Sequence, residues 1–317
     1  MIRLFILSFF IFFFFGCELD TSKPIQKELP KGSFLTVLGI AQDAGFPQAN
    51  CQKECCEIVW KHKHERNMVS CIAIVDSDSH RGWMFDATPD FKDQLFDLEN
   101  VSGSEKTDLG GIFLTHAHMG HYTGLMHLGR EAMGAKNVPV FAMPRMKDYL
   151  ENNGPWSQLV DLKNIEIQRL KNDSTIILNE NIQVTPLRVP HRDEFSETVG
   201  YRIRGKEKTA LFIPDIDKWH LWERDILEEI RKVDYAFLDG SFYQNGEIKG
   251  RDMSQIPHPF LEESMDLFKD LPKEEKSKIY FIHFNHTNPV LQKDSEVKNH
   301  ILKMGYQIAY EGQVIPM

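Results

Sequence analysis

Short apolar runs separated by polar turns recur along most of the chain and set its predicted architecture. Short runs rich in β-branched and aromatic residues are typical of buried strands, whereas longer segments with helical periodicity predict helices. The predicted strands cover 34–40, 70–75, 82–85, 110–114, 138–142, 182–189, 198–204, 209–213, 235–238 and 278–282. The predicted helices cover 91–98, 121–133, 145–151, 219–232 and 260–268. This alternation predicts an α/β fold built in packed layers.

Acidic or imidazole side chains stand where six of these strands end. They are Asp86, His116, His118, His121, His191, Asp215, Asp239 and His283. In a layered protein, such strand ends can converge on one edge, where a site forms. A single histidine at such a position is more often a solvated surface residue, but six equivalent positions together indicate a site.

The densest of these segments is Thr115-His116-Ala117-His118-Met119-Gly120-His121. In an extended loop, His116 and His118 point to the same side because side chains alternate with a period of two. Neutral imidazole is the commonest metal ligand, and paired histidines suit a zinc ion that keeps an open coordination position. The segment therefore predicts a metal site.

The overall charge narrows the choice of partners. The 317 residues carry a net charge of -9, with a pI of about 5.8. A broad basic field, which nucleic-acid binding requires, is therefore not expected. An apolar content of 42% supports a globular domain with an ample core. We expect a small-molecule substrate and no nucleic-acid partner, although a local basic groove stays compatible with this charge.

The first residues have the pattern of an export signal. A short positive start is followed by the apolar run 4–15 and then by Gly16 and Cys17. This run is too short to span a bilayer as a helix, which needs roughly 20 residues, but it suits the apolar core of a secretory signal. The segment resembles a bacterial lipoprotein signal, in which cleavage leaves Cys17 lipid-modified; an uncleaved anchor is the alternative. Either arrangement predicts an exported, membrane-anchored protein on the periplasmic or cell-surface side.

The predicted domain organisation follows from this start. Residues 1–17 are expected to form the lipoprotein-type signal, 18–32 a flexible polar tether, and 33–317 one folded domain.

Four cysteines remain after Cys17, namely Cys51, Cys55, Cys56 and Cys71. In an exported protein they could form two disulfides. Adjacent cysteines rarely pair with each other, because the resulting ring is strained. The tight clustering of the first three therefore favours a metal, whereas Cys71 lies in a predicted strand and is expected to be a small core residue.

From about residue 34 to 300, these features together resemble the metallo-β-lactamase superfamily. The resemblance implies an αββα sandwich with a metal pair at one edge. It assigns His116, His118 and His191 to the first metal, and His121, Asp215 and His283 to the second. Asp215 would bridge the metals, and Asp86 would orient a ligand or a water. The expected cofactor is zinc, one or two ions in the active site, with iron or manganese as alternatives.

One position departs from the superfamily pattern. The superfamily has an aspartate between the second and third histidines of the loop, where this chain has Gly120. Glycine has no ligand atom, so the second metal should bind more weakly unless water or another carboxylate substitutes. Asp239 or Asp217 could fill this place, and operation with a single metal is the alternative.

Two subgroups of the superfamily share longer motifs with the chain. The segments 43–51 (DAGFPQANC) and 283–289 (HFNHTNP) resemble the pyrroloquinoline quinone biosynthesis B family, although the histidine loop of that family is less histidine-rich. The clustered cysteines and the late His-x-x-His resemble the cyclic phosphodiesterases of phosphonate breakdown. The second resemblance implies a structural zinc.

The ligands of that structural zinc would be Cys51, Cys56 and His286 by resemblance. Cys55 departs from the usual Cys-x-Cys-x-x-Cys spacing, but it would still complete a closed Cys3His site. His62 and His64 lie nearby in the sequence as rival ligands. A disulfide or free thiols are the alternatives to zinc.

Three functions are compatible with these residues. The leading hypothesis is a metal-dependent hydrolase, in which a metal-activated hydroxide attacks an ester, lactam or phosphodiester bond, with Asp215 and Asp86 in catalytic roles. The second is an iron-dependent oxygenase or hydroxylase that acts in pyrroloquinoline quinone biosynthesis, because imidazole and carboxylate ligands also accept iron. The third is a non-catalytic metal-binding lipoprotein that lost turnover through Gly120.

Overall fold

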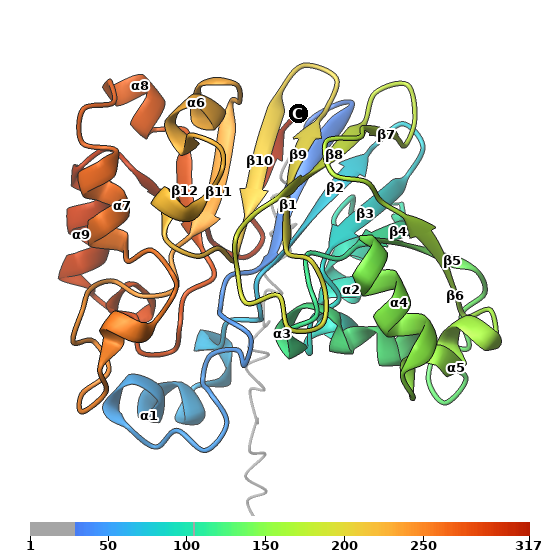
Figure 1. Cartoon of the computed structure of the whole chain (residues 1–317), viewed down its shortest axis with the longest axis horizontal. Coiled ribbons are helices and arrows are strands. Elements are labelled where there is room, and N and C mark those ends of the chain that lie inside the picture. The colour runs from blue at the N-terminus through green and yellow to red at the C-terminus, as the bar shows by residue number, and fades with distance from the viewer. Residues whose placement is uncertain (1–28, 104) are drawn as a thin grey trace, which may run out of the picture.

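The strands form two seven-stranded sheets that pack face to face, as the computed structural model of residues 29–103 and 105–317 shows (Figure 1). The first sheet has the order β14-β1-β2-β3-β4-β5-β6, and the second has the order β13-β12-β11-β10-β9-β8-β7. The strands of the first sheet are β1 (Ser33–Gly39), β2 (Cys71–Asp76), β3 (Arg81–Phe85), β4 (Asp108–Phe113), β5 (Val138–Ala142), β6 (Ile165–Arg169) and β14 (Val314–Pro316). Those of the second are β7 (Ile176–Ile177), β8 (Gln183–Arg188), β9 (Val199–Arg204), β10 (Thr209–Ile213), β11 (Tyr235–Asp239), β12 (Ile279–Ile282) and β13 (Gln307–Ile308).

The helices are short and lie between the strands in the sequence. The α-helices are α1 (Glu54–Lys61), α2 (Phe91–Asn100), α3 (Met119–Tyr122), α4 (Pro144–Asn152), α5 (Trp156–Asp161), α6 (Ile226–Arg231), α7 (Leu261–Leu267), α8 (Lys273–Lys276) and α9 (Glu296–Lys303). The 3-10 turns are η1 (Lys63–Glu65), η2 (Thr123–Leu128), η3 (Trp219–Leu221), η4 (Met253–Gln255) and η5 (Pro289–Leu291). Helices α2, α4 and α5 lie on one side of the strands, and α6, α7 and α9 lie on the other (Figure 1).

The period of two along β1 explains how one strand serves two apolar layers. Leu35 and Val37 enter the core between the sheets, whereas Phe34 and Leu38 face the layer that α2 covers. All four are buried, because a sheet with helices on its outer face has no solvated side. The predicted αββα sandwich is confirmed.

Strand direction explains why one edge of the sandwich collects the polar residues. In the first sheet, β1 is antiparallel to β2 and β2 to β3, so that β1, β3 and the parallel β4 point the same way. In the second sheet, β8, β10, β11 and β12 likewise share one direction. The loops that follow these seven strands carry the polar residues of the site.

Two predicted helices are shorter than expected. The 121–133 prediction is wrong after Leu128, where η2 ends and an irregular segment begins. Gly124 packs so closely that an added Cβ would lie 2.1 Å from the Thr88 carbonyl oxygen, and Gly134 adopts φ +56°, which ordinary helix excludes. The 219–232 prediction contains η3 and then α6, because Asp225 caps a new helix by accepting a hydrogen bond from the Leu227 amide (2.8 Å).

The predicted export signal and most of the predicted tether lie outside the described residues. Among the described residues, the first strand, β1, begins at Ser33. Within the residues that the structure describes, no helix combines the length and apolar character that crossing a membrane requires.

Candidate metal centre

The histidine loop after β4 is fixed by a buried carboxylate at the end of β3. Asp86 accepts hydrogen bonds from the Thr115 amide (2.7 Å) and the Thr115 hydroxyl (2.9 Å). Asp86 itself has φ +75°, a left-handed conformation that few non-glycine residues adopt. The loop therefore leaves the sheet in one defined direction.

A first ligand group consists of His116, His118, His191 and Asp215. One ligand atom of each lies within 4.8 Å of the corresponding atoms of the others. Their inward-facing atoms (His116 Nε2, His118 Nδ1, His191 Nε2 and Asp215 Oδ1) are buried and make no hydrogen bond to any described residue. Buried polar atoms without a partner are costly. Four of them facing one point fit a metal ion.

A second ligand group consists of Asp43, His121, Asp215 and His283, again within 4.8 Å of one another. Asp43 Oδ1 lies 3.1 Å from His121 Nε2 and 3.3 Å from His283 Nε2. Asp215 Oδ2 lies 3.4 Å from His116 Nε2 and 3.7 Å from His121 Nε2. Asp215 thus belongs to both groups, which is the position of a bridging ligand.

The outward-facing nitrogen of each histidine in the two groups has its own partner. These contacts are His116 Nδ1 to the Thr115 hydroxyl (3.0 Å), His118 Nε2 to Glu194 (3.1 Å), His121 Nδ1 to Asp86 (2.7 Å), His191 Nδ1 to Asp217 (3.0 Å) and His283 Nδ1 to the Ser241 hydroxyl (2.9 Å). Metal-binding histidines are held by such outer contacts, which fix the ring orientation. The five rings are therefore oriented to present one nitrogen each to the centre.

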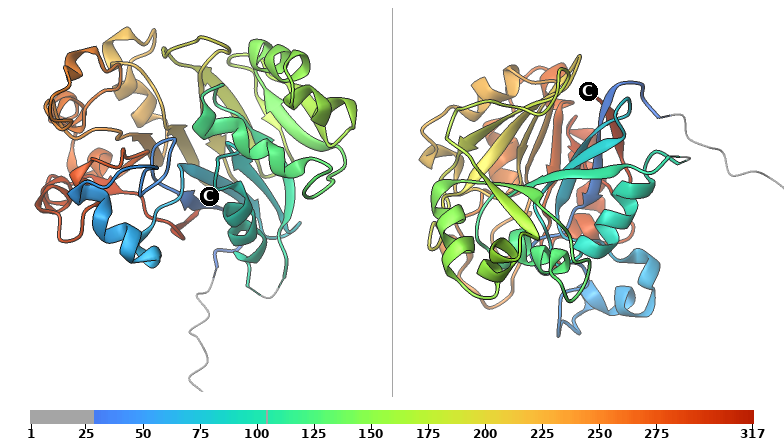
Figure 2. Two further views of the ribbon diagram at one scale, coloured as in Figure 1. Left: turned by 90° about the horizontal axis from the view of Figure 1, so that it is seen from below. Right: turned by 90° about the vertical axis from the view of Figure 1, so that its right-hand side faces the viewer.

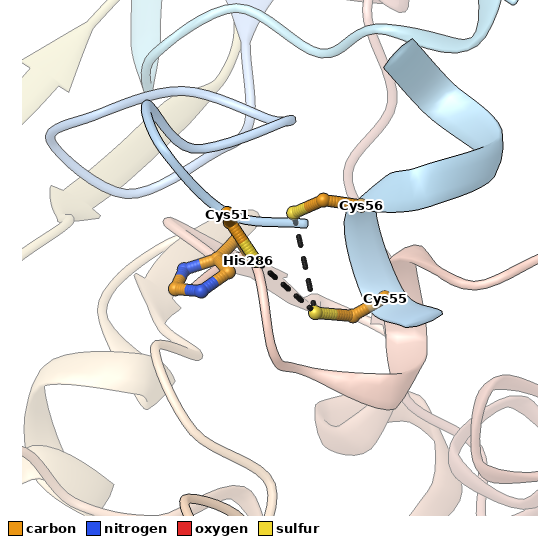
Figure 3. A group of neighbouring side chains, drawn as sticks. All are labelled: Cys51, Cys55, Cys56 and His286. Atoms are coloured by element: carbon orange, nitrogen blue, oxygen red, sulfur yellow. Dashed lines mark hydrogen bonds between the residues drawn. The ribbon is translucent and has the colours of Figure 1, made fainter. Parts of the chain in front are cut away.

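A separate group of Cys51, Cys55, Cys56 and His286 lies at the start of α1, which carries Cys55 and Cys56 (Figure 3). The Cys51 and Cys55 sulfurs are 3.8 Å apart, and the Cys55 and Cys56 sulfurs 4.0 Å. A tetrahedral zinc with Zn–S bonds of about 2.3 Å places its sulfurs about 3.8 Å apart. All the cysteines among the described residues are free thiols, and His286 Nδ1 is buried without a hydrogen bond to a described residue. The spacing fits a closed structural zinc.

The rival ligands named from the sequence lie elsewhere. His62 and His64 pack against each other, with their ring centroids 5.8 Å apart, and do not belong to the cysteine group. Cys71 is fully buried in β2, as expected of a core residue. Burial raises the pKa of Cys56 to about 12, so that this thiol stays protonated unless a metal displaces its proton.

The family model of the beta-lactamase superfamily domain matches residues 81–284, more than half of the chain. The chain belongs to the beta-lactamase superfamily. Among curated relatives, coenzyme PQQ synthesis protein B of Acinetobacter baylyi is 26% identical over 307 residues, covering 89% of this chain and 99% of that protein. Its Klebsiella pneumoniae counterpart is 25% identical and covers 90% of this chain and 98% of that protein.

Solved structures of the superfamily show the same fold. Zinc-bound PqqB from Methylobacterium extorquens has a TM-score of 0.75 at 21% identity and covers 90% of this chain and 100% of that chain. A diphosphatase of the PhnP family has a TM-score of 0.61 at 22% identity and covers 89% and 96% of the two chains. The predicted resemblance to the superfamily and to its pyrroloquinoline quinone biosynthesis B branch is confirmed.

The carboxylates expected to compensate for Gly120 in the superfamily pattern are engaged elsewhere. Asp217 contacts His191 from outside the centre. Asp239 accepts hydrogen bonds from the amides of Ile216 (3.2 Å) and Ser241 (2.8 Å) and contacts His258. Neither Asp239 nor Asp217 belongs to the second group; Asp239 instead forms a further possible ligand group with Asp215 and His258. The carboxylate that joins the second group is Asp43.

Asp86, expected to act in catalysis, lies behind the ligands of this superfamily site. It is fully buried, and its contacts to Thr115 and His121 place it one residue away from the centre. This agrees with an orienting role for the carboxylate. Asp215, by contrast, lies at the centre itself.

The sequence pattern does not assign two residues of the superfamily site. Asp43 lies in the loop after β1, and His258 lies at the end of a long loop after β11. His258 Nδ1 lies 2.8 Å from Asp239 Oδ2 and 3.2 Å from Asp215 Oδ1. Asp43 stands in a segment already singled out as a motif, whereas His258 follows no predicted strand and gave no such signal.

The charges of the superfamily site also favour a cation. Burial alone would raise the pKa of Asp215, but the neighbouring His191 and His258 hold it well below its usual value. Burial lowers the pKa of His116 well below its ordinary value. For His191, burial is outweighed by Asp215 and Asp217, which raise its pKa to about 10. Without a metal the centre therefore holds protons on a histidine, and a divalent ion would replace them.

Proposed function

We propose that the protein is a metal-dependent hydrolase with a two-metal centre that acts on an ester or phosphodiester bond. The observation that carries this proposal is the convergence of two sets of histidines on Asp215, with the ligand atoms of the first set buried and unpartnered. Metal-binding sites with this donor set accept zinc readily. The zinc-bound relative of the same fold supports this choice of ion.

The residues of the centre divide the work of hydrolysis. Bound zinc would lower the pKa of a water and polarise the scissile carbonyl or phosphoryl oxygen. Asp215 faces both ligand groups with Oδ2, so that it fixes their separation and can accept a hydrogen bond from the attacking water. Asp86 and Asp217 keep His121 and His191 from rotating. The protein thus holds the metal ligands in position and fixes the orientation of their rings.

We assign to His258 the transfer of a proton to the leaving group. Its Nδ1 is held by Asp239, and Asp239 is itself anchored by two backbone amides. Buried His258 has a raised pKa because Asp239 and Asp215 outweigh the effect of burial. A protonated His258 has its second N–H free for donation, since the described residues give Nε2 no hydrogen-bond partner.

Kinetics and metal analysis test this function together. Zinc-loaded protein should hydrolyse one member of a panel of carboxylic esters, lactams, diphosphates and aryl phosphodiesters. His258→Gln should keep its zinc content and lower kcat about 100-fold, because general acid catalysis contributes roughly that much. Conservative His127→Gln, on the partly exposed turn η2, is the control and should change neither. Full zinc occupancy without turnover on any class would instead favour the metal-binding lipoprotein.

The curated relatives support a second candidate function. Proteins named for coenzyme PQQ synthesis cover 87 to 90% of the chain at 23 to 26% identity. An iron-dependent oxygenase would use the same imidazole and carboxylate ligands. Protein purified without chelators would then contain iron, and substrate addition would consume oxygen. Zinc-supported turnover without oxygen uptake would exclude this alternative.

The cellular location is proposed on the first 17 residues alone. We infer that the protein is exported and anchored by lipid on Cys17, because a short positive start, an apolar run and a small residue precede that cysteine. Mass spectrometry of the mature N-terminus tests this inference. A diacylglyceryl mass on Cys17 is expected, and an unmodified Met1 would exclude it.

A further inference from the structure

The geometry points to a carboxylate ligand that comes from a different loop than in the superfamily pattern. Asp43, in the loop after β1, supplies the carboxylate of the second metal, and position 120 must be glycine to leave room for it. This inference deepens the metal centre on which the proposed function rests. It replaces the simpler view that Gly120 leaves the second metal one ligand short.

The first observation is steric. A Cβ atom added to Gly120 would lie 2.4 Å from Asp43 Cα, 2.7 Å from Asp43 Cβ and 2.8 Å from Asp43 Oδ1. Real Cβ atoms do not approach heavy atoms so closely, and two of these three atoms belong to the Asp43 side chain. Asp43 therefore fills the space into which a side chain at position 120 would project. The two positions cannot both carry a side chain without movement of a loop.

The second observation is the direction of the Asp43 carboxylate. Its Oδ1 atom lies 3.1 Å from His121 Nε2 and 3.3 Å from His283 Nε2, the inward-facing nitrogens of the second group. Those rings are held from behind by Asp86 and Ser241. One oxygen and two nitrogens thus surround the same point, together with Asp215.

The third observation is that the backbone holds Asp43 in this place. The amide of Gln42 donates to the Phe284 carbonyl (2.8 Å), and the amide of Phe284 donates to the Ile40 carbonyl (2.8 Å). These bonds tie the loop after β1 directly to the residue that follows His283. The Asp43 position is therefore set by the same segment that supplies the last histidine.

The decisive variant is Gly120→Asp, because the two views of Gly120 predict opposite results. If the second metal merely lacks a ligand, wild type binds one zinc per active site and Gly120→Asp binds two. If Asp43 is the ligand, wild type binds two, and Gly120→Asp displaces Asp43 and weakens the second ion. Elemental analysis gives the count, and titration against a chromophoric chelator gives the dissociation constants.

Three further variants keep the test independent of folding. Asp43→Ala should weaken the second zinc by about 100-fold or more, as loss of a direct ligand exceeds the 10- to 100-fold cost of losing an outer contact, and should leave the first unchanged. Gly120→Ala should weaken the second ion without adding any ligand. Gly154→Ala, where an added Cβ meets nothing within 4 Å, is the matched control and should bind as wild type. Circular dichroism would confirm that each variant is folded.

The outcomes separate this inference from the proposed function. Two active-site zinc ions in wild type and one in Asp43→Ala, each besides the zinc of the cysteine group, would support Asp43 as the ligand, even if every substrate panel gave no turnover. An Asp43→Ala protein that binds the second ion as tightly as wild type would overturn it. So would a gain of an ion in Gly120→Asp.

Discussion

Asp215→Ala is expected to lose both active-site metals and all measurable hydrolysis. Asp215 is the residue common to the two ligand groups, and it is almost fully buried between their histidines. Its removal leaves the first group with His116, His118 and His191 alone and takes a carboxylate from the second. It also removes the carboxylate shared by the five imidazole ligands, so that less buried negative charge offsets two dications.

Elemental analysis of the active-site zinc measures this effect, with activity as a second readout. Asp217→Ala is the matched control, because Asp217 contacts His191 from outside the centre. That variant should weaken only the first ion, by about 10- to 100-fold. Two tightly bound active-site ions in Asp215→Ala would contradict the bridging position. Zinc retained at the cysteine group is expected in both variants and shows that each protein is folded.

Ten strands are predicted from the sequence because each is a short apolar run, whichever sheet it joins. The strands β6, β7, β13 and β14 are not among them, and three of these four have only two or three residues. The period of two along β1 predicts a strand but not which of its faces meets the second sheet, since both faces are buried. The ends of the helices are harder to predict from the sequence than those of the strands. The segment 123–128 is a 3-10 helix whose Gly124 packs against Thr88, a long-range contact that periodicity does not reveal.

The candidate site likewise contains residues that the sequence predicts and residues that only long-range contacts reveal. The residues at strand ends could be predicted as a group, because parallel strands deliver their following loops to one edge, and the structure brings His116, His118, His191 and Asp215 together. Asp43 could not be assigned, because its role depends on a loop crossing to meet Gly120, nearly 80 residues away in the sequence. His258 was missed because a long irregular loop places it.

His286→Ala is expected to lose the structural zinc and, through it, to weaken the second active-site ion. The cysteine group and the second ligand group are built on the same two loops. One loop carries Asp43 and then Cys51, and the other carries His283 and then His286. Figures 1 and 2 show α1, which bears the other two cysteines, beside the C-terminal half of the chain. A zinc held by four ligands from these segments would fix the separation of Asp43 and His283.

The expected result is loss of one zinc, a roughly 10-fold weaker second active-site ion and an unchanged first ion, because the first group lies on other loops. The melting temperature should fall by roughly 5 to 10 °C, as expected for the loss of a few kcal/mol in a domain of this size. His64→Ala is the matched control, because His64 is an exposed histidine close to the same helix and outside the ligand group. If His286→Ala loses its zinc while the second active-site ion keeps its full affinity, the two centres are independent. In that case the hydrogen bonds between Gln42, Phe284 and Ile40 suffice to hold Asp43 beside His283.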